Sequence, residues 1–315
     1  MKKKIGIVFP GQGSQKVGMG QDLFETLAFA KEKADQANSF LNKPLSSLCI
    51  NGPKETLTLT ENAQPGLFLV SAILFDLLEQ NGITPTVVAG HSLGELTAYY
   101  ASKILSFEDT LHLIRERGQS MAHATPQGTS GMAAVLGQSI RDIQSTITPY
   151  QDAPVVIANI NCPGQIVISG EINALNQAIT ALKNNGAKVI SLPVSGAFHS
   201  PLMAPAQRHL HTVVDTLSFS NASTPIVLNR TAAPESDDNV LKNNVPDHVI
   251  SPVQWIQSIQ CMMTQCELII ECGSGKVLSG LIKKIDPAFP VLSISDLDSF
   301  NIALETIMKK ENVTQ

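Results

Sequence analysis

The sequence predicts an α/β protein that contains one mainly parallel sheet and a smaller inserted unit with the element order βαββαβ. Two observations indicate this class. Short β-branched runs alternate with apolar helical repeats over much of the chain, and this rhythm changes between residues 127 and 196. Because parallel strands need crossover connections, the alternation favours a parallel sheet that helices cover on both faces.

The large unit begins with a short β-branched run that ends at the tight-loop sequence Pro10-Gly11-Gln12-Gly13. Apolar residues then recur at helical spacing, and a second short strand leads directly into a helix. The expected elements are strands over 4–9 and 86–89 and helices over 19–34, 64–79 and 93–103. We predict one large domain from residues 1–126 and 197–315, in which the polar stretch 232–244 is an exposed loop.

The segment 127–196 can be divided into elements on its own. Its expected strands are 132–136, 155–159, 165–169 and 187–191, and its expected helices are 139–147 and 173–183. This order is typical of a ferredoxin-like subdomain, which can be inserted where its chain ends lie close together. Glycine, serine and threonine residues at 128–131 and 195–196 are the expected hinges.

Composition limits the possible functions. The chain has 315 residues, of which 43% are hydrophobic and 16% charged, and its formal net charge of -5 predicts no nucleic-acid partner. The run from Ile5 to Phe9 is too short for a signal peptide, and the apolar stretch 66–78 is too short for a membrane span. We therefore expect a cytoplasmic protein with five reduced cysteines, no membrane contact, and no metal site at Cys261, Cys266 and Cys272.

The chemistry is concentrated at Gly90-His91-Ser92-Leu93-Gly94, between an expected strand and an expected helix. Gly-x-Ser-x-Gly in this context predicts the nucleophile elbow of an α/β-hydrolase-like sheet, with Ser92 as nucleophile. Free N–H groups at the helix start favour a negative oxygen, so the N–H of Leu93 is the expected oxyanion donor. The alternative interpretation is a structural turn without chemistry.

A serine hydroxyl needs a base, and seven histidines are present. We favour His199, because it follows the glycine hinge where the inserted unit returns to the main sheet. His209 and His211 fall on an expected helix and are interpreted as surface or packing residues. His91 is expected to point to the opposite side of the elbow.

Seven segments resemble bacterial malonyl-CoA:acyl carrier protein transacylases and the acyltransferase domains of fatty acid and polyketide synthases. They run in order almost from end to end: residues 9–15, 64–65, 90–95, 117–121, 159–164, 196–200 and 251–255. The resemblance implies a malonyl-CoA:acyl carrier protein S-malonyltransferase of fatty acid biosynthesis, with malonyl-CoA and acyl carrier protein as partners and no cofactor.

The resemblance also implies roles for single residues. Ser92 carries the malonyl group as an ester, His199 is base and then acid, and the N–H groups of Gln12 and Leu93 form the oxyanion hole. In the family a main-chain carbonyl near the position of Gln254 steadies the histidine, in place of the carboxylate of a hydrolase triad. We expect the protein to be a monomer.

Substrate selection is expected to depend on Arg117, whose guanidinium can pair with the malonyl carboxylate. The resemblance implies that Phe198 restricts space for an α-methyl branch, which disfavours methylmalonyl. Gln64, Met121, Asn161 and Gln254 match pocket positions of the family, and a packing or loop-stabilising role is the alternative for each. For the carrier protein we expect a basic rim, for which Lys188, Lys276, Lys283 and Lys284 are candidates, although each is better interpreted as a solvated surface lysine.

Two other functions stay open at this point. A serine hydrolase or thioesterase could use the same Ser92 and His199 and release the free acid to water. A non-catalytic module could instead bind coenzyme A or a carrier protein. A nucleotide site at Gly11-Gln12-Gly13 is disfavoured, because no Gly-Lys-Ser/Thr follows and the spacing of Gly-x-Gly-x-x-Gly fails at Lys16.

Overall fold

A computed structural model of the chain describes residues 3–150 and 155–312. The large sheet contains β1 (Ile5–Phe9), β2 (Val87–Gly90), β7 (Ile226–Val227), β8 (Pro234–Glu235), β9 (Leu268–Cys272) and β10 (Val291–Ile294). Its strand order is β10-β9-β1-β2-β7-β8; neighbours are parallel, except that β8 runs antiparallel to β7. The prediction of an α/β fold with a mostly parallel sheet is confirmed.

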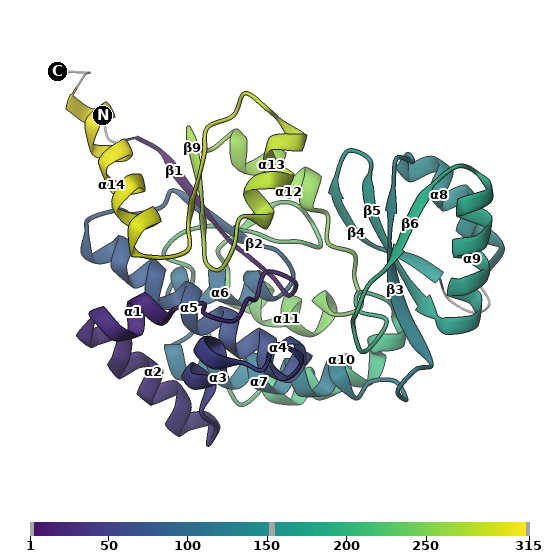
Figure 1. The fold of residues 1–315 in the computed structure, drawn as a ribbon, viewed down its shortest axis with the longest axis horizontal. Helices are drawn as coiled ribbons and strands as arrows, with labels where there is room; N and C mark the ends of the chain where they lie inside the picture. Colours follow the sequence, from purple (N-terminus) through teal and green to yellow (C-terminus); the bar gives the residue numbers. More distant parts are fainter. Residues whose placement is uncertain (1–2, 151–154, 313–315) are drawn as a thin grey trace.

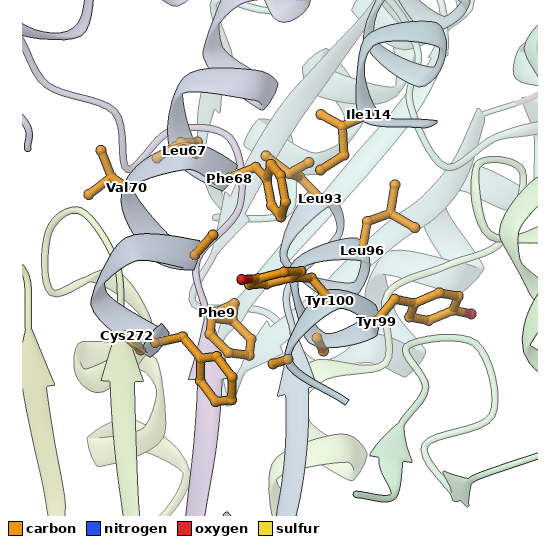
Figure 2. Close-up of a cluster of buried hydrophobic side chains, with 14 of the residues drawn as sticks. Phe9, Leu67, Phe68, Val70, Leu93, Leu96, Tyr99, Tyr100, Ile114 and Cys272 are labelled. Atoms are coloured by element: carbon orange, nitrogen blue, oxygen red, sulfur yellow. The ribbon is translucent and has the colours of Figure 1, made fainter. Parts of the chain in front are cut away.

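Both faces of this sheet are buried, as the continuous apolar runs of its strands require. Along β1, Ile7 and Phe9 face one apolar cluster, whereas Val8 faces another. The first cluster includes side chains of the helix before β2 and of the helix after it. Figure 2 shows Phe9 among Phe68, Tyr100 and their neighbours. The sheet therefore holds its strand ends in fixed positions, which is what a site at these ends needs.

Helices surround the large sheet (Figure 1). They are α1 (Gln21–Thr26), α2 (Ala28–Leu41), α3 (Leu45–Asn51), α4 (Lys54–Thr58), α5 (Thr60–Gln80), α6 (Leu93–Ala101), α7 (Phe107–Ala122), α10 (Ala204–Val214), α11 (Asp238–His248), α12 (Trp255–Met263), α13 (Val277–Ile285) and α14 (Leu297–Asn312), with the short 3-10 helix η2 (Pro201–Met203). The expected helix over 19–34 is two helices, because Leu27 is extended, with φ −106° and ψ 118°.

The second sheet is built from residues inside the segment 127–196. It contains β3 (Ser130–Leu136), β4 (Val155–Cys162), β5 (Gln165–Glu171) and β6 (Lys188–Ser191) in the antiparallel order β4-β5-β3-β6. Helices α8 (Ile140–Ile147) and α9 (Ile172–Asn184) pack on it around an apolar cluster of its own, and a 3-10 turn, η1 (Thr148–Tyr150), follows α8. This unit lies at the right of Figure 1; residues 151–154 within it lie outside the described part of the chain.

The two sheets are joined near the end of β4. The N–H of Val253 donates to the carbonyl of Ala158 at 2.8 Å, and the carbonyl of Val253 accepts from the N–H of Ile160 at 2.9 Å. Helix α12 begins two residues later and contacts both β4 and β2. The segment before α12 thus ties the small sheet to the large one beside the ends of β1 and β2.

The prediction of an exposed loop over 232–244 is wrong. This stretch contains β8 and most of α11, which begins after Asp237, whose carboxylate accepts from the N–H groups of Asn239 and Val240 at 3.0 Å. Leu241 and Val245 are buried on the inner side of the helix, which packs against α10. Because only a few apolar residues are needed to bury one side of a short helix, the polar composition hid it.

All five cysteines are free thiols, and all except the partly exposed Cys261 are buried. The apolar stretch 66–78 lies within the buried helix α5, as the sequence predicted. Within residues 3–150 and 155–312, no helix has the length and apolar character needed to cross a membrane. The same residues contain no group of three or more His, Cys, Asp or Glu side chains that could hold a metal ion.

Candidate active site

Ser92 lies at a sharp turn between β2 and α6. Its φ of 51° and ψ of −107° are unusual for a residue with a side chain and cost about 1–3 kcal/mol, which the surrounding packing must supply. A Cβ at Gly90 would lie 1.8 Å from the carbonyl carbon of Gly94, and a Cβ at Gly94 would lie 2.0 Å from the oxygen of Phe9. Both glycines of the motif are therefore required sterically by the elbow.

The loop after β1 runs alongside this elbow, because β1 and β2 are parallel neighbours with their carboxyl ends at the same edge. A Cβ at Gly11 would lie 2.3 Å from the carbonyl oxygen of His91, so only glycine permits this approach. Leu93 is the first residue of α6, and neither its N–H nor that of Gln12 has an acceptor among the described residues. Both N–H groups are free to bind a substrate oxygen.

His199 contacts the serine directly. Its Nε2 lies 2.8 Å from Ser92 Oγ, although the two residues are 107 positions apart. Its Nδ1 lies 2.9 Å from the carbonyl oxygen of Ser251 and 3.1 Å from that of His248. Carbonyl oxygens only accept hydrogen bonds, so Nδ1 carries the proton and Nε2 is left to accept the one on Ser92. The carbonyl of Ser251 lies three residues before Gln254 and so is near the position that the resemblance implies, whereas the carbonyl of His248 was not expected.

Burial governs the protonation of this histidine. His199 is 3% exposed, and burial, followed by the positive charge of Arg117 and the ring of His91, lowers its pKa to about 3. The two carbonyl contacts act in the opposite direction and are outweighed. The imidazole is therefore neutral at physiological pH, which is the state of a general base.

Arg117 lies on α7 and points into the site, with only 1% of its surface exposed. Its Nη1 donates to Gln64 Oε1 at 2.8 Å, and its Nη2 donates to Ser92 Oγ at 3.1 Å, whereas its Nε has no partner within residues 3–150 and 155–312. Burial lowers the pKa of Arg117 to about 10, and the carboxylate of Glu95 partly offsets this decrease. The guanidinium is therefore charged at neutral pH. A buried cation with incompletely used donors is suited to binding a carboxylate.

These groups open into a cavity of about 200 Å³. Of the residues predicted to form the site, those that line it are Gln12, Gln64, Ser92, Leu93, Arg117, Met121, Phe198 and His199. Asn161 and Gln254 are not in its lining. The Asn161 side chain contacts His91 Nε2 at 2.8 Å, and the Gln254 amide donates to the carbonyl of Arg230.

A larger cavity of about 610 Å³ adjoins the first, and the two share Gln12, Thr58, Pro193 and Val194. Neither cavity is lined by the four lysines expected to form a basic rim. Lys188 and Lys276 are exposed elsewhere, and Lys283 donates to two carbonyl oxygens near the end of α13. The charged groups that do line the larger cavity are Glu55 and Glu61, with His123 beside them.

Comparison with known proteins is consistent with this geometry. The acyl transferase domain family matches residues 7–272. The malonyl CoA-acyl carrier protein transacylase of Bacillus subtilis (strain 168) is 41% identical over 314 residues, which cover 98% of each chain. The chain belongs to the acyl transferase domain family. The transacylase of Staphylococcus aureus (strain MSSA476), a further relative, is 40% identical over 299 residues, 94% of this chain and 96% of that one.

Solved structures of the family superimpose closely on this acyl transferase domain. The malonyl CoA-acyl carrier protein transacylase of Clostridium perfringens has a TM-score of 0.94 at 33% identity and 99% coverage of both chains. A malonyl-transacylase in complex with its holo type II PKS acyl-carrier protein has a TM-score of 0.93 at 32% identity, covering 96% of this chain and 99% of that one.

The sequence did not single out a buried polar network behind Ser92 in this acyl transferase domain. Asn229 accepts from the N–H of Ser92, and the carboxylate of Glu95 accepts from the N–H of Asn229. His248 Nδ1 lies 3.7 Å from the same carboxylate. Glu95 follows the motif directly, but Asn229 lies 137 positions from Ser92, just after the apolar run 226–228, and carries no local signal.

Proposed function

We propose that the chain transfers a malonyl group from malonyl-CoA to the phosphopantetheine thiol of acyl carrier protein, through an ester on Ser92. The observation that carries the proposal is the buried guanidinium of Arg117 within 3.1 Å of the Ser92 hydroxyl, which itself contacts His199 at 2.8 Å. A charged donor beside a nucleophile suits an acyl group that ends in a carboxylate. The names of the relatives support the same reaction.

In the first half-reaction, Ser92 Oγ attacks the thioester carbonyl of malonyl-CoA while its proton passes to His199 Nε2. The carbonyl oxygen becomes negative, and the free N–H groups of Gln12 and Leu93 stabilise it. The intermediate then collapses, the carbon–sulfur bond breaks, and the proton on His199 passes to the departing CoA sulfur. The product is malonyl-Ser92 and free CoA.

In the second half-reaction, the phosphopantetheine thiol of the carrier protein takes the place of CoA. His199 removes the thiol proton, the sulfur attacks the ester carbonyl, and the proton is returned to Ser92 Oγ as the ester bond breaks. The same oxyanion donors serve both halves. No step requires a metal ion or a redox cofactor.

Selectivity follows from two side chains in the cavity lining. Arg117 pairs with the malonyl carboxylate, whereas an acetyl group offers this buried cation no anionic partner and gains nothing from it. Phe198 limits the space next to the α-carbon of the acyl group. A methyl group in such a pocket is worth only about 1–3 kcal/mol, so exclusion of methylmalonyl is the weaker of the two effects.

Intact-mass measurement tests the proposal. Incubation with malonyl-CoA should add one malonyl group to the protein, and holo carrier protein should remove it and gain the same mass. Ser92→Ala should give no adduct. Ser274→Ala is a matched control, because this buried hydroxyl contacts the carbonyl of Ser14 instead of the site. An adduct of equal yield on Ser92→Ala would refute the proposal.

A thioesterase that uses the same Ser92 and His199 is the second candidate, since the hydroxyl and imidazole contact alone serves hydrolysis equally well. The two differ in the acceptor. Malonyl-Ser92 that persists for minutes in buffer and disappears only when a thiol acceptor is added supports the transferase. Rapid release of malonate in the absence of an acceptor supports the thioesterase.

We also propose that residues 1–126 and 197–315 form an α/β-hydrolase-like domain and that residues 127–196 form a ferredoxin-like subdomain inserted into it. Support comes from the two separate sheets and from an apolar cluster confined to the second sheet and its helices. The protein is proposed to act as a monomer in the cytoplasm, which is in keeping with its five free cysteines.

A further inference from the structure

Asn229 occupies the position where the pairing of β2 with β7 stops. The ladder pairs Val88 with Ile226 and Ala89 with Val227, after which the chain leaves β7. Beyond this point the side-chain amide of Asn229 continues the pairing. Its Oδ1 accepts from the N–H of Ser92 at 2.8 Å, and its Nδ2 donates to the carbonyl of Gly90 at 2.6 Å.

A primary amide has one acceptor and two donors, so Asn229 can replace the missing peptide group of a neighbouring strand. The two groups that it holds lie on either side of His91, across the turn that gives Ser92 its φ of 51°. The two hydrogen bonds therefore restrain the φ and ψ angles of His91, which set the direction in which the chain enters the turn at Ser92.

Asn229 is itself held on several sides and is fully buried. Its N–H donates to the carboxylate of Glu95 at 2.6 Å, and its carbonyl accepts from the N–H of Gln254 at 2.9 Å. His248 Nε2 lies 3.3 Å from its Oδ1, and the carbonyl of His248 contacts His199 Nδ1. One residue is thus connected to the backbone that orients both the serine and the histidine.

We propose that Asn229 is a positioning residue for Ser92: its side-chain amide clamps Gly90 and Ser92 and keeps the Ser92 hydroxyl aligned with His199 Nε2. The inference rests on the proposed function only in so far as Ser92 is the nucleophile. Asn229 touches no reacting atom and acts through the backbone of the elbow. Misplacement of a reacting group by about 1 Å can cost about 10²-fold in rate.

Labelling of Ser92 by a small fluorophosphonate tests the alignment, because this reagent needs an activated serine and no recognition of malonyl or carrier protein. Asn229→Ala should lower the labelling rate and the kcat of malonyl transfer by about 10²-fold and leave the KM for malonyl-CoA within about threefold. Asn38→Ala is the matched control. Asn38 likewise bridges two groups, the N–H and hydroxyl of Ser46, far from the site, and should label at the wild-type rate.

Asn229→Asp separates positioning from general stability. A protonated aspartic acid can still accept from Ser92 and donate to Gly90, whereas an ionised one places a second acceptor against the Gly90 carbonyl. The labelling rate relative to wild type should therefore fall as pH rises. Glu95, His248, His199 and the neighbouring Arg117 and Arg230 are present in both proteins, so the ratio removes most of their own pH dependence.

The outcomes are distinguishable. The inference would be overturned if Asn229→Ala were labelled at the wild-type rate. It would also be overturned if the labelling rate of Asn229→Asp relative to wild type did not change with pH while circular dichroism showed a folded protein. The proposed substrate would be refuted, and the positioning role supported, by a third outcome. In that outcome the wild-type protein is labelled at Ser92 but transfers no malonyl group, and Asn229→Ala is not labelled.

Discussion

Replacing Arg117 with Ala should separate malonyl transfer from acetyl transfer. Arg117 is 1% exposed, and among the described residues its guanidinium forms hydrogen bonds only with Gln64 and Ser92, so little else stands in for it. A carboxylate that accepts two charge-assisted hydrogen bonds, each worth about 1.5–3 kcal/mol, gains about 3–6 kcal/mol. The substitution should therefore lower kcat/KM for malonyl-CoA by about 10²–10⁴-fold.

The assay is transfer of radiolabelled acyl groups from malonyl-CoA and from acetyl-CoA to holo acyl carrier protein, with kcat/KM measured for each. An acetyl group makes no ionic contact with the arginine, so its kcat/KM should change less than about tenfold. Arg115→Ala is the matched control, because Arg115 is on the same helix but pairs with Glu116 and is 30% exposed. It should leave both values near wild type.

Equal losses for the two acyl groups in Arg117→Ala would refute this reasoning. Such a result would mean that the arginine acts through the fold or through the hydroxyl of Ser92 and not through the malonyl carboxylate. Acetyl transfer also reports on folding, because a misfolded protein would lose both activities. Measuring the two donors with one preparation of the variant removes any uncertainty about its concentration.

Four further results are expected. Burial is the main cause that lowers the pKa of His199 to about 3, so its neutral form persists well below pH 6.5. The fall of kcat/KM for malonyl transfer at low pH should therefore have its midpoint below about pH 5. A midpoint at or above pH 6.5 would contradict this. Gly94→Ala places a Cβ 2.0 Å from the oxygen of Phe9 and should lower the free energy of unfolding by about 3 kcal/mol in urea titrations. The Cβ of Gly280→Ala, on the exposed face of α13, would meet no described atom within 4 Å apart from the backbone of its own helix, and this substitution should raise the free energy of unfolding by about 0.5–1 kcal/mol instead. Phe198→Ala should raise the ratio of methylmalonyl to malonyl kcat/KM by about tenfold, and an unchanged ratio in competition assays would show that the ring does not limit the pocket.

Features set by neighbouring residues could be predicted from the sequence. Ser92 was expected between a strand and a helix, and the structure has β2 end at Gly90 and α6 begin at Leu93. The reason is local: an apolar β-branched run, a helical repeat and two glycines whose missing side chains permit the turn all lie within a few residues. The prediction of a loop over 232–244 was wrong because it used composition alone, which does not show the buried side of a short helix.

Features that join distant residues could not be predicted in this way. The second carbonyl that holds His199 comes from His248, outside the segment 251–255 that resembles the family, and Asn161 contacts His91 without lining the cavity itself. These contacts depend on side-chain directions after the two sheets have packed together. A family resemblance carries over the residue types but not the direction in which each side chain points.

The sequence by itself determined the elbow at Ser92, the alternation that makes a mostly parallel sheet, and the second run of strands and helices after residue 127. Steric limits at glycine and the periodicity of apolar residues act along the chain, so they can be read from it. Only the tertiary structure decided that Asn229 accepts a hydrogen bond from the N–H of Ser92 and that Glu95 accepts one from the N–H of Asn229. Strand β7 pairs with β2 only in the folded sheet, and this pairing places Asn229 Oδ1 2.8 Å from the backbone nitrogen of Ser92, 137 positions earlier in the chain.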